Sequence, residues 1–281
     1  MHKDLVRLTQ IAAADSRLII GLMSGTSLDG LDIALCKFHG QGRSTKVEVL
    51  EFYTWPYDEK LRSELKAISS KPLVDLQKVT LLNAYLGAYH AELIRKSLKK
   101  WNVSPNDVDL IASHGQTIFH APFSQHQERP YANATLQIGD GDHIAVKTGI
   151  ITLSDFRQKH IAAGGEGAPL AGYGDSLIFS SETENRLLLN IGGIANFTYL
   201  PVTGSLQSLL TTDTGPGNTL MDQYVQRMFP GKSYDQDGEI AKTGKVHEQL
   251  LTTLKANSFF DSSFPKTTGP EVFSLPYVDQ A

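Results

Sequence analysis

The sequence is short of cysteine and of long apolar runs. Cys36 is the only cysteine among 281 residues, so no disulfide can form within the chain, and a reducing compartment is the simplest interpretation. No segment approaches the ~18 apolar residues that a membrane helix requires. Residues 1–16 lack the apolar stretch of a signal peptide, and we expect a frayed tail there. These absences predict a cytoplasmic protein without a membrane partner.

Charge of either sign is also limited. Charged residues make up 20% of the chain, and 30 acidic against 26 basic residues give a net charge of −4. A weakly acidic surface disfavours a general binder of nucleic acids, although it allows a local phosphate pocket. No segment is of low complexity, 41% of the residues are apolar, and the length predicts about two globular domains.

Short apolar strands and helical stripes alternate along the chain. Three apolar runs predict an antiparallel meander: 18–23, 31–38 and 46–55. Apolar residues at helical spacing predict helices over 61–68 and 74–98, and a buried strand is expected at 109–113. This order predicts an α/β protein whose sheet is partly parallel.

The second half of the sequence repeats the opening theme. Residues 186–201 form an apolar strand, a glycine turn and another apolar strand, as residues 18–38 do. A segment rich in Gly and Ala at 156–176 separates the halves. A duplicated α/β domain is therefore expected, with an N-terminal domain at 1–157 and a second domain at 158–281.

Two glycine-rich turns are candidates for phosphate binding. Between the first two strands, residues 24–30 read SGTSLDG, and backbone N–H groups there can converge on an anion while the hydroxyls add donors. The turn is neither a P-loop nor a GxGxxG fingerprint. Gly192 and Gly193 offer similar chemistry in the second half. Together the turns predict two hairpins that grip the phosphates of one nucleotide from opposite sides of a cleft, with an ordinary hairpin turn as the alternative for each.

Three further polar segments lie at or just past the ends of expected strands, two of which are 151–155 and 208–213. Asp213 begins the run DTGPGN, where a carboxylate can act as a general base or cap a turn. Asp155 and Arg157 suit a polyol that carries a carboxylate, or else form a surface ion pair. The run SHGQT contains His114, which shares no helical face with His120, so a metal site there is disfavoured.

Five ordered segments together resemble the family of 1,6-anhydro-N-acetylmuramic acid kinases. They are GLMSGTSLDGLDIAL, SHGQTIFH, SDFR with AAGGEGAPL, LNIGGIAN and DTGPGNTLMD. The resemblance extends from about Ile19 to Tyr277. It implies an α/β protein of the two-domain actin-like ATPase or sugar-kinase (ribonuclease H-like) fold. Family members continue beyond Ala281, which implies that the second domain is incomplete here.

The resemblance implies an ATP-dependent kinase of bacterial peptidoglycan recycling. Such an enzyme hydrolytically opens 1,6-anhydro-N-acetylmuramic acid and phosphorylates O6, giving N-acetylmuramic acid 6-phosphate. Two alternatives stay open: another actin-like sugar phosphotransferase or ATPase, and an inactive binding fragment. The expected partners are the sugar and ATP, without nucleic acid or membrane, and a homodimer stays open.

The resemblance also implies roles for individual residues. Asp213 matches the catalytic base, and the sugar is expected at His114, Gln116, Asp155 and Arg157. Mg²⁺ is expected with ATP, and Asp29 or Asp213 is the candidate metal-proximal carboxylate. The residues expected to bind ATP and its phosphates are Ser24, Gly25, Thr26, Ser27, Leu28, Asp29, Gly30, Leu31, Gly192, Gly193 and Asn196.

Overall fold

A mixed sheet covered by helices confirms the predicted α/β class. The structure is a computed structural model that describes residues 2–25, 27–202, 208–269 and 272–281. The chain divides into two compact units, Met1–Leu170 and Ala171–Ala281. The boundary expected between residues 157 and 158 lies within the first unit. Each unit is described by itself below.

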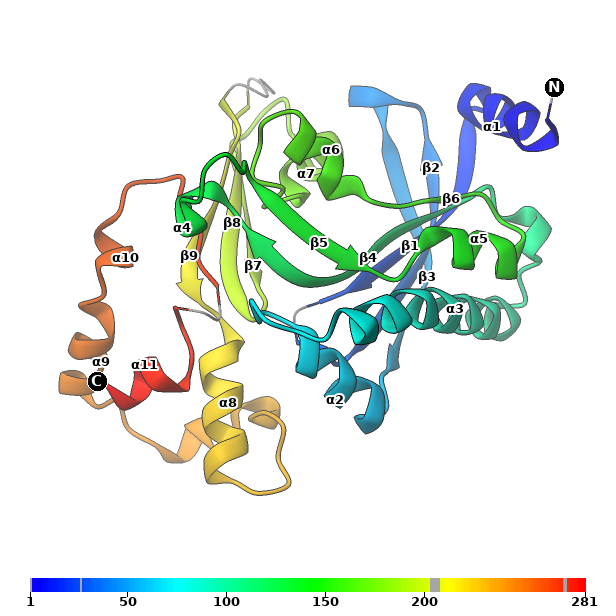
Figure 1. Cartoon of the computed structure of the whole chain (residues 1–281). Coiled ribbons are helices and arrows are strands. Elements are labelled where there is room, and N and C mark those ends of the chain that lie inside the picture. Colours follow the sequence, from blue (N-terminus) through cyan, green and yellow to red (C-terminus); the bar gives the residue numbers. More distant parts are fainter. Residues whose placement is uncertain (1, 26, 203–207, 270–271) are drawn as a thin grey trace. The chain divides into compact units, whose positions relative to one another are not determined.

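The first unit is built on a six-stranded sheet (Figure 1). The strand order is β3-β2-β1-β4-β5, and β6 pairs with β4 on a side path. β1 and β4 run parallel, whereas β1, β2 and β3 form the antiparallel meander that the apolar runs predict. The strands are β1 (Ser16–Ser24), β2 (Gly30–His39), β3 (Lys46–Pro56), β4 (Leu110–Ala121), β5 (Ala134–Ile138) and β6 (Thr152–Leu153).

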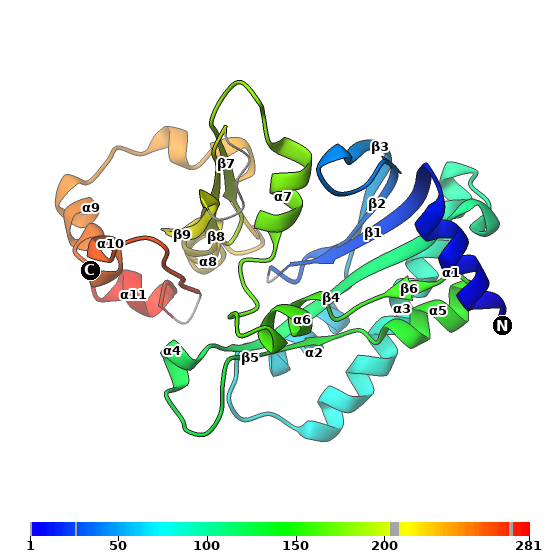
Figure 2. The same cartoon turned by 90° about the horizontal axis from the view of Figure 1, so that it is seen from above.

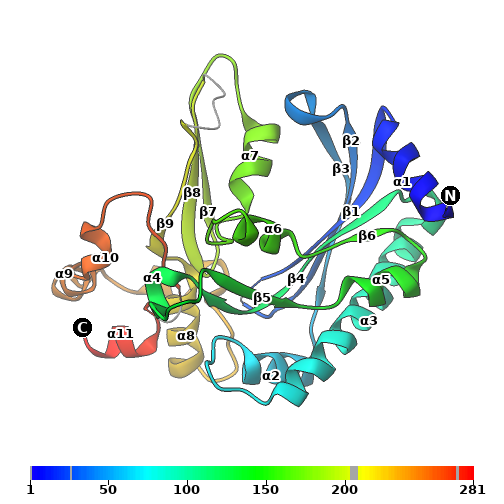
Figure 3. The same ribbon diagram turned by 45° about the horizontal axis from the view of Figure 1, so that its top comes forward.

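Strand β4 is longer than the predicted segment 109–113. Leu22 pairs with Ser113 and Ser24 with Gln116, so β1 advances two residues while β4 advances three, which is a β-bulge. Gly115 lies in the bulge at φ +73, and a Cβ there would lie 2.8 Å from Ile138 O. The predicted strand end was wrong because the chain changes partner at the bulge: beyond it, β4 pairs antiparallel with β5, as Figure 3 shows.

Helices α2 (Glu59–Ile68) and α3 (Leu76–Trp101) confirm the two predicted helical stripes. Leu61, Leu65 and Ile68 are buried on α2, and α3 buries Leu86 among other apolar residues. Asp58 caps α2 by accepting a hydrogen bond from Leu61 N at 2.8 Å. These stripes pack on Ile20, Ile33 and Ile111 of the sheet in one apolar core. The long helix α3 also packs against α5 (Gly141–Thr148), as Figure 2 shows.

The frayed tail expected at residues 1–16 is instead largely a helix, α1 (Lys3–Ala13). The guanidinium of Arg17 donates to Ile11 O and Ala12 O, both at 2.9 Å, and so satisfies carbonyls at the end of the helix. Arg7 donates to Val108 O at 2.9 Å. The expectation failed because these long side chains tie the helix to the first unit.

No helix among the described residues has the length and apolarity needed to span a membrane.

The second unit contains an antiparallel sheet in the order β7-β8-β9. Like β1-β2-β3, these strands are consecutive and antiparallel, so the repeat seen in the sequence extends to a third strand. Phe273 is fully buried, and its ring contacts those of Phe259, Phe260 and Tyr277. The elements are α7 (Ala171–Phe179), β7 (Arg186–Ile191), β8 (Ile194–Leu200), β9 (Leu210–Pro216), α8 (Asn218–Met228), α9 (Glu248–Lys255), α10 (Ser258–Asp261) and α11 (Leu275–Asp279). The first unit also has the short helices α4 (Phe123–His126) and α6 (Phe156–Ala162).

Gly87 on α3 marks a close helix contact that can be tested. A Cβ at Gly87 would lie 2.4 Å from Asp140 O, whereas a Cβ at Gly174 on α7 would meet no atom within 4 Å. Alanine is favoured over glycine within a helix by up to ~1 kcal/mol. Gly174→Ala should therefore raise the free energy of unfolding, and Gly87→Ala should lower it by about 1–3 kcal/mol. Urea denaturation followed by circular dichroism measures both, and stabilisation by Gly87→Ala would contradict the close packing.

Candidate active site

The turn between β1 and β2 is anchored from the core side. Ser24 is 2% exposed, and its Oγ donates to Gln116 Oε1 at 2.5 Å. Tyr57 N donates to Asp29 O at 3.0 Å. Leu28 has a φ of 56°, which is uncommon for a residue other than glycine, yet its side chain is buried in the core. Core packing therefore holds the turn in a conformation that is unfavourable by itself.

The predicted phosphate residues of this turn differ in what they expose. Ser27 and Asp29 are exposed, and Ser27 Oγ donates to Asp29 Oδ1 at 2.7 Å. Leu31, in contrast, is a core residue. Gly30 is needed because a Cβ there would lie 2.4 Å from Trp55 O. Thr26 lies outside the described residues.

Gln116 lies beneath this turn with its side chain fully buried. Its Nε2 donates to Gly25 O and to Thr117 O, both at 3.1 Å, while Oε1 accepts from Ser24. The sequence placed Gln116 with the expected sugar residues, and its side-chain amide is bonded to Ser24 and Gly25 of the turn between β1 and β2. It ties β4 to the backbone of that turn.

His114 and Arg157, both predicted sugar residues, are joined by a hydrogen bond. Arg157 donates from Nε to His114 Nε2 at 2.9 Å and from Nη1 to Gly167 O at 2.6 Å. Because arginine is only a donor, His114 Nε2 accepts, and its Nδ1–H donates to Gly115 O at 2.8 Å. Burial, aided by the Arg157 charge, lowers the pKa of His114, so this imidazole is neutral near pH 7.

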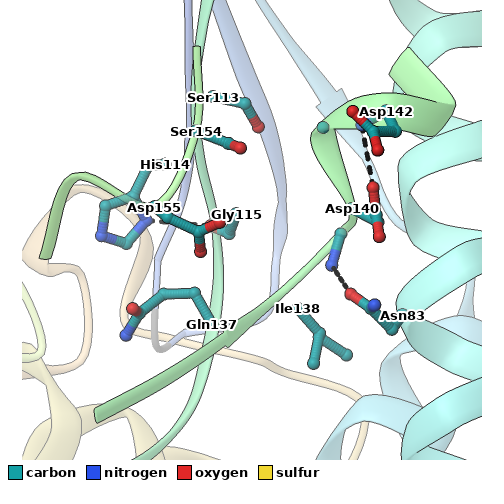
Figure 4. A pocket seen from close by; sticks show the side chains of 12 residues that line it. Asn83, Ser113, His114, Gly115, Gln137, Ile138, Asp140, Asp142, Ser154 and Asp155 are labelled. Atoms are coloured by element: carbon teal, nitrogen blue, oxygen red, sulfur yellow. Dashed lines mark hydrogen bonds between the residues drawn. The ribbon is translucent and has the colours of Figure 1, made fainter. Parts of the chain in front are cut away.

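A polar cavity of about 240 Å³ lies beside His114 (Figure 4). Its wall includes Ser113, His114, Gln137, Asp140, Ser154 and Asp155. Ser113 Oγ and Gln137 Oε1 are buried, and neither has a hydrogen-bond partner in the part of the chain that the structure describes. Buried polar atoms without a partner cost about 1–3 kcal/mol each.

Two backbone features shape this cavity. Asn83 on α3 accepts a hydrogen bond from Gly139 N at 2.9 Å, and Asp140 caps α5 by accepting from Asp142 N at 2.8 Å. Asp155 has a φ of 59° just before α6. Among the residues that line the cavity, sequence analysis identified His114 and Asp155. It missed Asn83, Gln137 and Asp140, for which the turn around Gly139 was the only signal in the sequence.

In the second unit, Asp213 lies within β9, because the strand that the sequence predicted to end at Asp213 continues through Pro216. Asp213 pairs with Asn196 on β8, and Asn196 pairs with Asn190 on β7. Directly opposed residues share one face of a sheet, so the three side chains form a row. Thr268 N donates to Asp213 Oδ2 at 2.9 Å and orients the carboxylate. Asn190 is a site candidate that the sequence did not single out, although it stands in the quoted run LNIGGIAN.

The Gly192–Gly193 turn is closely joined to the start of α8. Asn218 N donates to Gly192 O at 2.8 Å, and Gly217 N donates to Gly193 O at 2.9 Å. A Cβ at Gly217 would lie 2.2 Å from Gly192 O, so glycine is required there. The first amides of α8 are thus used by the turn, and phosphate binding here would depend on other donors.

A magnesium site was expected at Asp29. Among the residues that the structure describes, no group of three or more His, Cys, Asp or Glu side chains is placed to hold a metal ion. Mg²⁺ in nucleotide sites typically binds one or two carboxylates together with substrate phosphates. The exposed carboxylate of Asp29, beside the turn, fits that simpler donor set.

The fold, the glycine turns and the polar cavity together define an α/β protein with a small-molecule site. The family model described as "Anhydro-N-acetylmuramic acid kinase" matches residues 17–281. The chain belongs to this family, which confirms the predicted kinase class.

Curated relatives agree with that assignment. A protein of Pseudoalteromonas atlantica named "Anhydro-N-acetylmuramic acid kinase" is 55% identical over 100% of this chain and 70% of its own length. Proteins with the same name from Caldanaerobacter subterraneus and Bacillus thuringiensis are 45% and 42% identical, over 97% and 93% of this chain and 69% and 68% of their own lengths. A solved "Reductive activator for corrinoid,iron-sulfur protein" is similar at a TM-score of 0.36 and 15% identity, over 72% of this chain and 31% of that protein. That likeness is too weak to define the fold.

The lowered pKa of His114 predicts a pH dependence of stability. The folded pKa lies below the ordinary 6.5, so the unfolded chain takes up the proton first as the pH falls. Stability is then fully present above pH 6.5 and declines as the pH falls toward the folded pKa. His114→Gln removes this titration and should make the decline between pH 7 and pH 5 shallower, by up to about 1.4 kcal/mol per pH unit. Urea midpoints at each pH measure the difference, and parallel curves for both proteins would contradict the prediction.

Proposed function

We propose that this chain uses ATP to phosphorylate 1,6-anhydro-N-acetylmuramic acid at O6 while water opens the anhydro ring. The product is N-acetylmuramic acid 6-phosphate, an intermediate of peptidoglycan recycling. The observation that carries the proposal is the family match over residues 17–281, which spans every site segment described above.

We further propose an actin-like fold with one domain in each unit, divided after Leu170 and not at the boundary expected from the sequence. The repeated antiparallel order of β1-β2-β3 and β7-β8-β9 supports a duplicated domain. The use of ATP and the single cysteine favour the cytoplasm. A homodimer is a separate proposal that sedimentation equilibrium decides.

The polar cavity beside His114 is the proposed sugar site. The sugar offers hydroxyl groups, an amide and a carboxylate. Its hydroxyls can pair with Ser113 Oγ and Gln137 Oε1, which lack partners in the described residues, and with the carboxylate of Asp155. The charge of Arg157, next to His114, suits the sugar carboxylate. Gln116 contributes by holding the phosphate turn.

Asp213 is the proposed general base. Its carboxylate takes a proton from water, the water oxygen bonds to C1, and the C1–O6 bond breaks. O6 then takes the γ-phosphoryl group of ATP, ADP leaves, and the proton on Asp213 passes to solvent. The N–H of Thr268, which donates to Asp213 Oδ2 at 2.9 Å, orients the carboxylate that is proposed as the base.

The first phosphate turn, with Gly192, Gly193 and Asn196, is proposed to bind ATP. Mg²⁺ supplies charge neutralisation on the phosphates when bound. Asp29 is the residue that would hold it. Ser27 keeps the Asp29 carboxylate in place through the hydrogen bond from its Oγ.

Replacing the base tests the proposed reaction. Asp213→Asn keeps the shape and the acceptor for Thr268 N but removes the basic carboxylate, so sugar-dependent turnover should fall by about 10²–10⁴-fold. ATP affinity should be nearly unchanged. ADP release with and without the anhydro sugar measures turnover, and Asp261→Asn, an exposed carboxylate of the same unit, is the matched control. Near-normal turnover in Asp213→Asn would remove Asp213 from the mechanism.

Replacing Arg157 tests the sugar site. Lysine keeps the positive charge but cannot donate to both His114 and Gly167 in the same fork geometry. Arg157→Lys should therefore raise the KM for the sugar by about 10–100-fold and leave the KM for ATP within about twofold. Steady-state kinetics with each substrate varied in turn measures the two constants. A rise confined to ATP would assign the cavity to the nucleotide.

A further inference from the structure

Beneath the first phosphate turn, four side chains form one buried chain of hydrogen bonds. Gln116 Oε1 lies 2.5 Å from Ser24 Oγ, Ser24 Oγ lies 2.9 Å from Tyr57 Oη, and Tyr57 Oη lies 2.8 Å from His90 Nε2. Gln116 and His90 are fully buried, Ser24 is 2% exposed and Tyr57 is 4% exposed. None of these groups is used as an acid or base in the reaction proposed above.

The direction of every bond in this chain follows from Gln116. The amide Nε2 donates to Gly25 O and Thr117 O, so Oε1 can only accept. Ser24 therefore gives its single proton to Gln116, and the longer contact from Ser24 Oγ to Gly30 O, at 3.3 Å, competes for the same proton.

The same logic extends to the far end of the chain. Because Ser24 Oγ has given its proton to Gln116, it accepts from Tyr57, and the Tyr57 oxygen in turn accepts from His90. His90 must then carry its proton on Nε2, and Nδ1 is an acceptor.

His90 is fully buried, which keeps the ring neutral, so the proton on Nε2 is its only ring proton. Burial lowers its pKa to about 3, so it stays uncharged through the physiological range. Nδ1 is buried and has no partner among the residues that the structure describes. A buried polar atom in that state is costly, and an apolar side chain would avoid the cost. The imidazole of His90 therefore has a cost that packing alone does not explain, which indicates a role in hydrogen bonding.

We propose that Tyr57 and His90 are positioning residues for nucleotide binding. They orient Ser24 Oγ, and through Gln116 they fix the carbonyl of Gly25 and the backbone of the turn that receives the phosphates. The inference rests on the proposed function, in which this turn binds ATP. It adds two residues, one on α3 and one just after β3, that do not touch substrate.

Removing the Tyr57 hydroxyl is the direct test. Tyr57→Phe keeps the buried ring but leaves Ser24 without its donor and His90 without its acceptor. The Kd for ATP of the full chain, measured by isothermal titration calorimetry, should rise by about tenfold. The Kd for the sugar should stay within about twofold, which a general loss of structure would not produce.

Tyr89→Phe is the matched control. Tyr89 packs against the same core, its ring centroid lies 6.2 Å from that of Tyr57, and no described hydrogen bond uses its hydroxyl. The control should leave the Kd for ATP unchanged even if both variants lower the melting temperature. An equal Kd in Tyr57→Phe and Tyr89→Phe would overturn the inference.

Two variants of His90 separate hydrogen bonding from packing. His90→Gln retains an N–H donor for Tyr57 and should keep ATP binding within about twofold to threefold of the parent chain. His90→Leu fills similar space without a donor and should weaken ATP binding. In the double variant Tyr57→Phe/His90→Leu, the loss of ATP affinity should be close to that of Tyr57→Phe alone, because the two residues act through the same chain of hydrogen bonds. Full additivity of the two losses would contradict the inference.

The protonation state of His90 gives a readout without any ligand. Nitrogen-15 NMR of the histidine rings should show His90 protonated on Nε2 and unchanged from pH 5 to pH 8. A proton on Nδ1 would reverse the bond directions and overturn the inference. Failure of the unsubstituted chain to bind ATP would instead overturn the proposed function, and this inference with it.

Discussion

The bulge in β4 at Gly115 is the constraint on which the first unit's site depends. Ile111 and Ser113 before the bulge, and Gln116 and Ile118 after it, are all buried, because the bulge shifts the inward-facing positions of β4 from odd to even residue numbers. Without it, Gln116 would leave the core and Ser24 would lose its acceptor. Glycine is required in the bulge because Ile138 O approaches so closely that a Cβ would collide with it. One backbone irregularity thus shapes the cavity wall and supports the turn between β1 and β2.

Helix α3 carries the second layer of support on a single stripe. Asn83, Gly87 and His90 follow one another at helical spacing. Asn83 holds Gly139 N, Gly87 permits the approach of Asp140, and His90 ends the hydrogen-bond chain from the turn. A Cβ at Gly139 would itself lie 3.7 Å from His90 Cε1. The cavity and the turn therefore depend on the same face of the same helix.

The parts predicted from the sequence are those governed by local periodicity. The meander, the stripes of α2 and α3 and the repeated hairpin follow from apolar spacing alone. The continuation of β4 depends on a change of partner at Gly115, and α1 depends on the reach of Arg17, so neither has a local signal. The same holds within the site: His114 and Asp155 stand in recognisable runs, whereas Asn83 and Gln137 acquire their roles only through tertiary contacts.

In the second unit, the start of α8 leaves few free amides for a phosphate, so the ATP contacts proposed for Gly192 and Gly193 need donors from elsewhere. The amides at the start of α8 already donate to the carbonyls of Gly192 and Gly193, so the positive end of that helix is partly neutralised. Thr214 is the additional residue of a bulge in β9, and its hydroxyl donates to Ala195 O at 3.0 Å. This bulge brings Asp213 opposite Asn196. A carboxylate so placed would repel phosphate oxygens, whereas it can orient and deprotonate a neutral water molecule, and this chemistry agrees with the base role proposed above for Asp213.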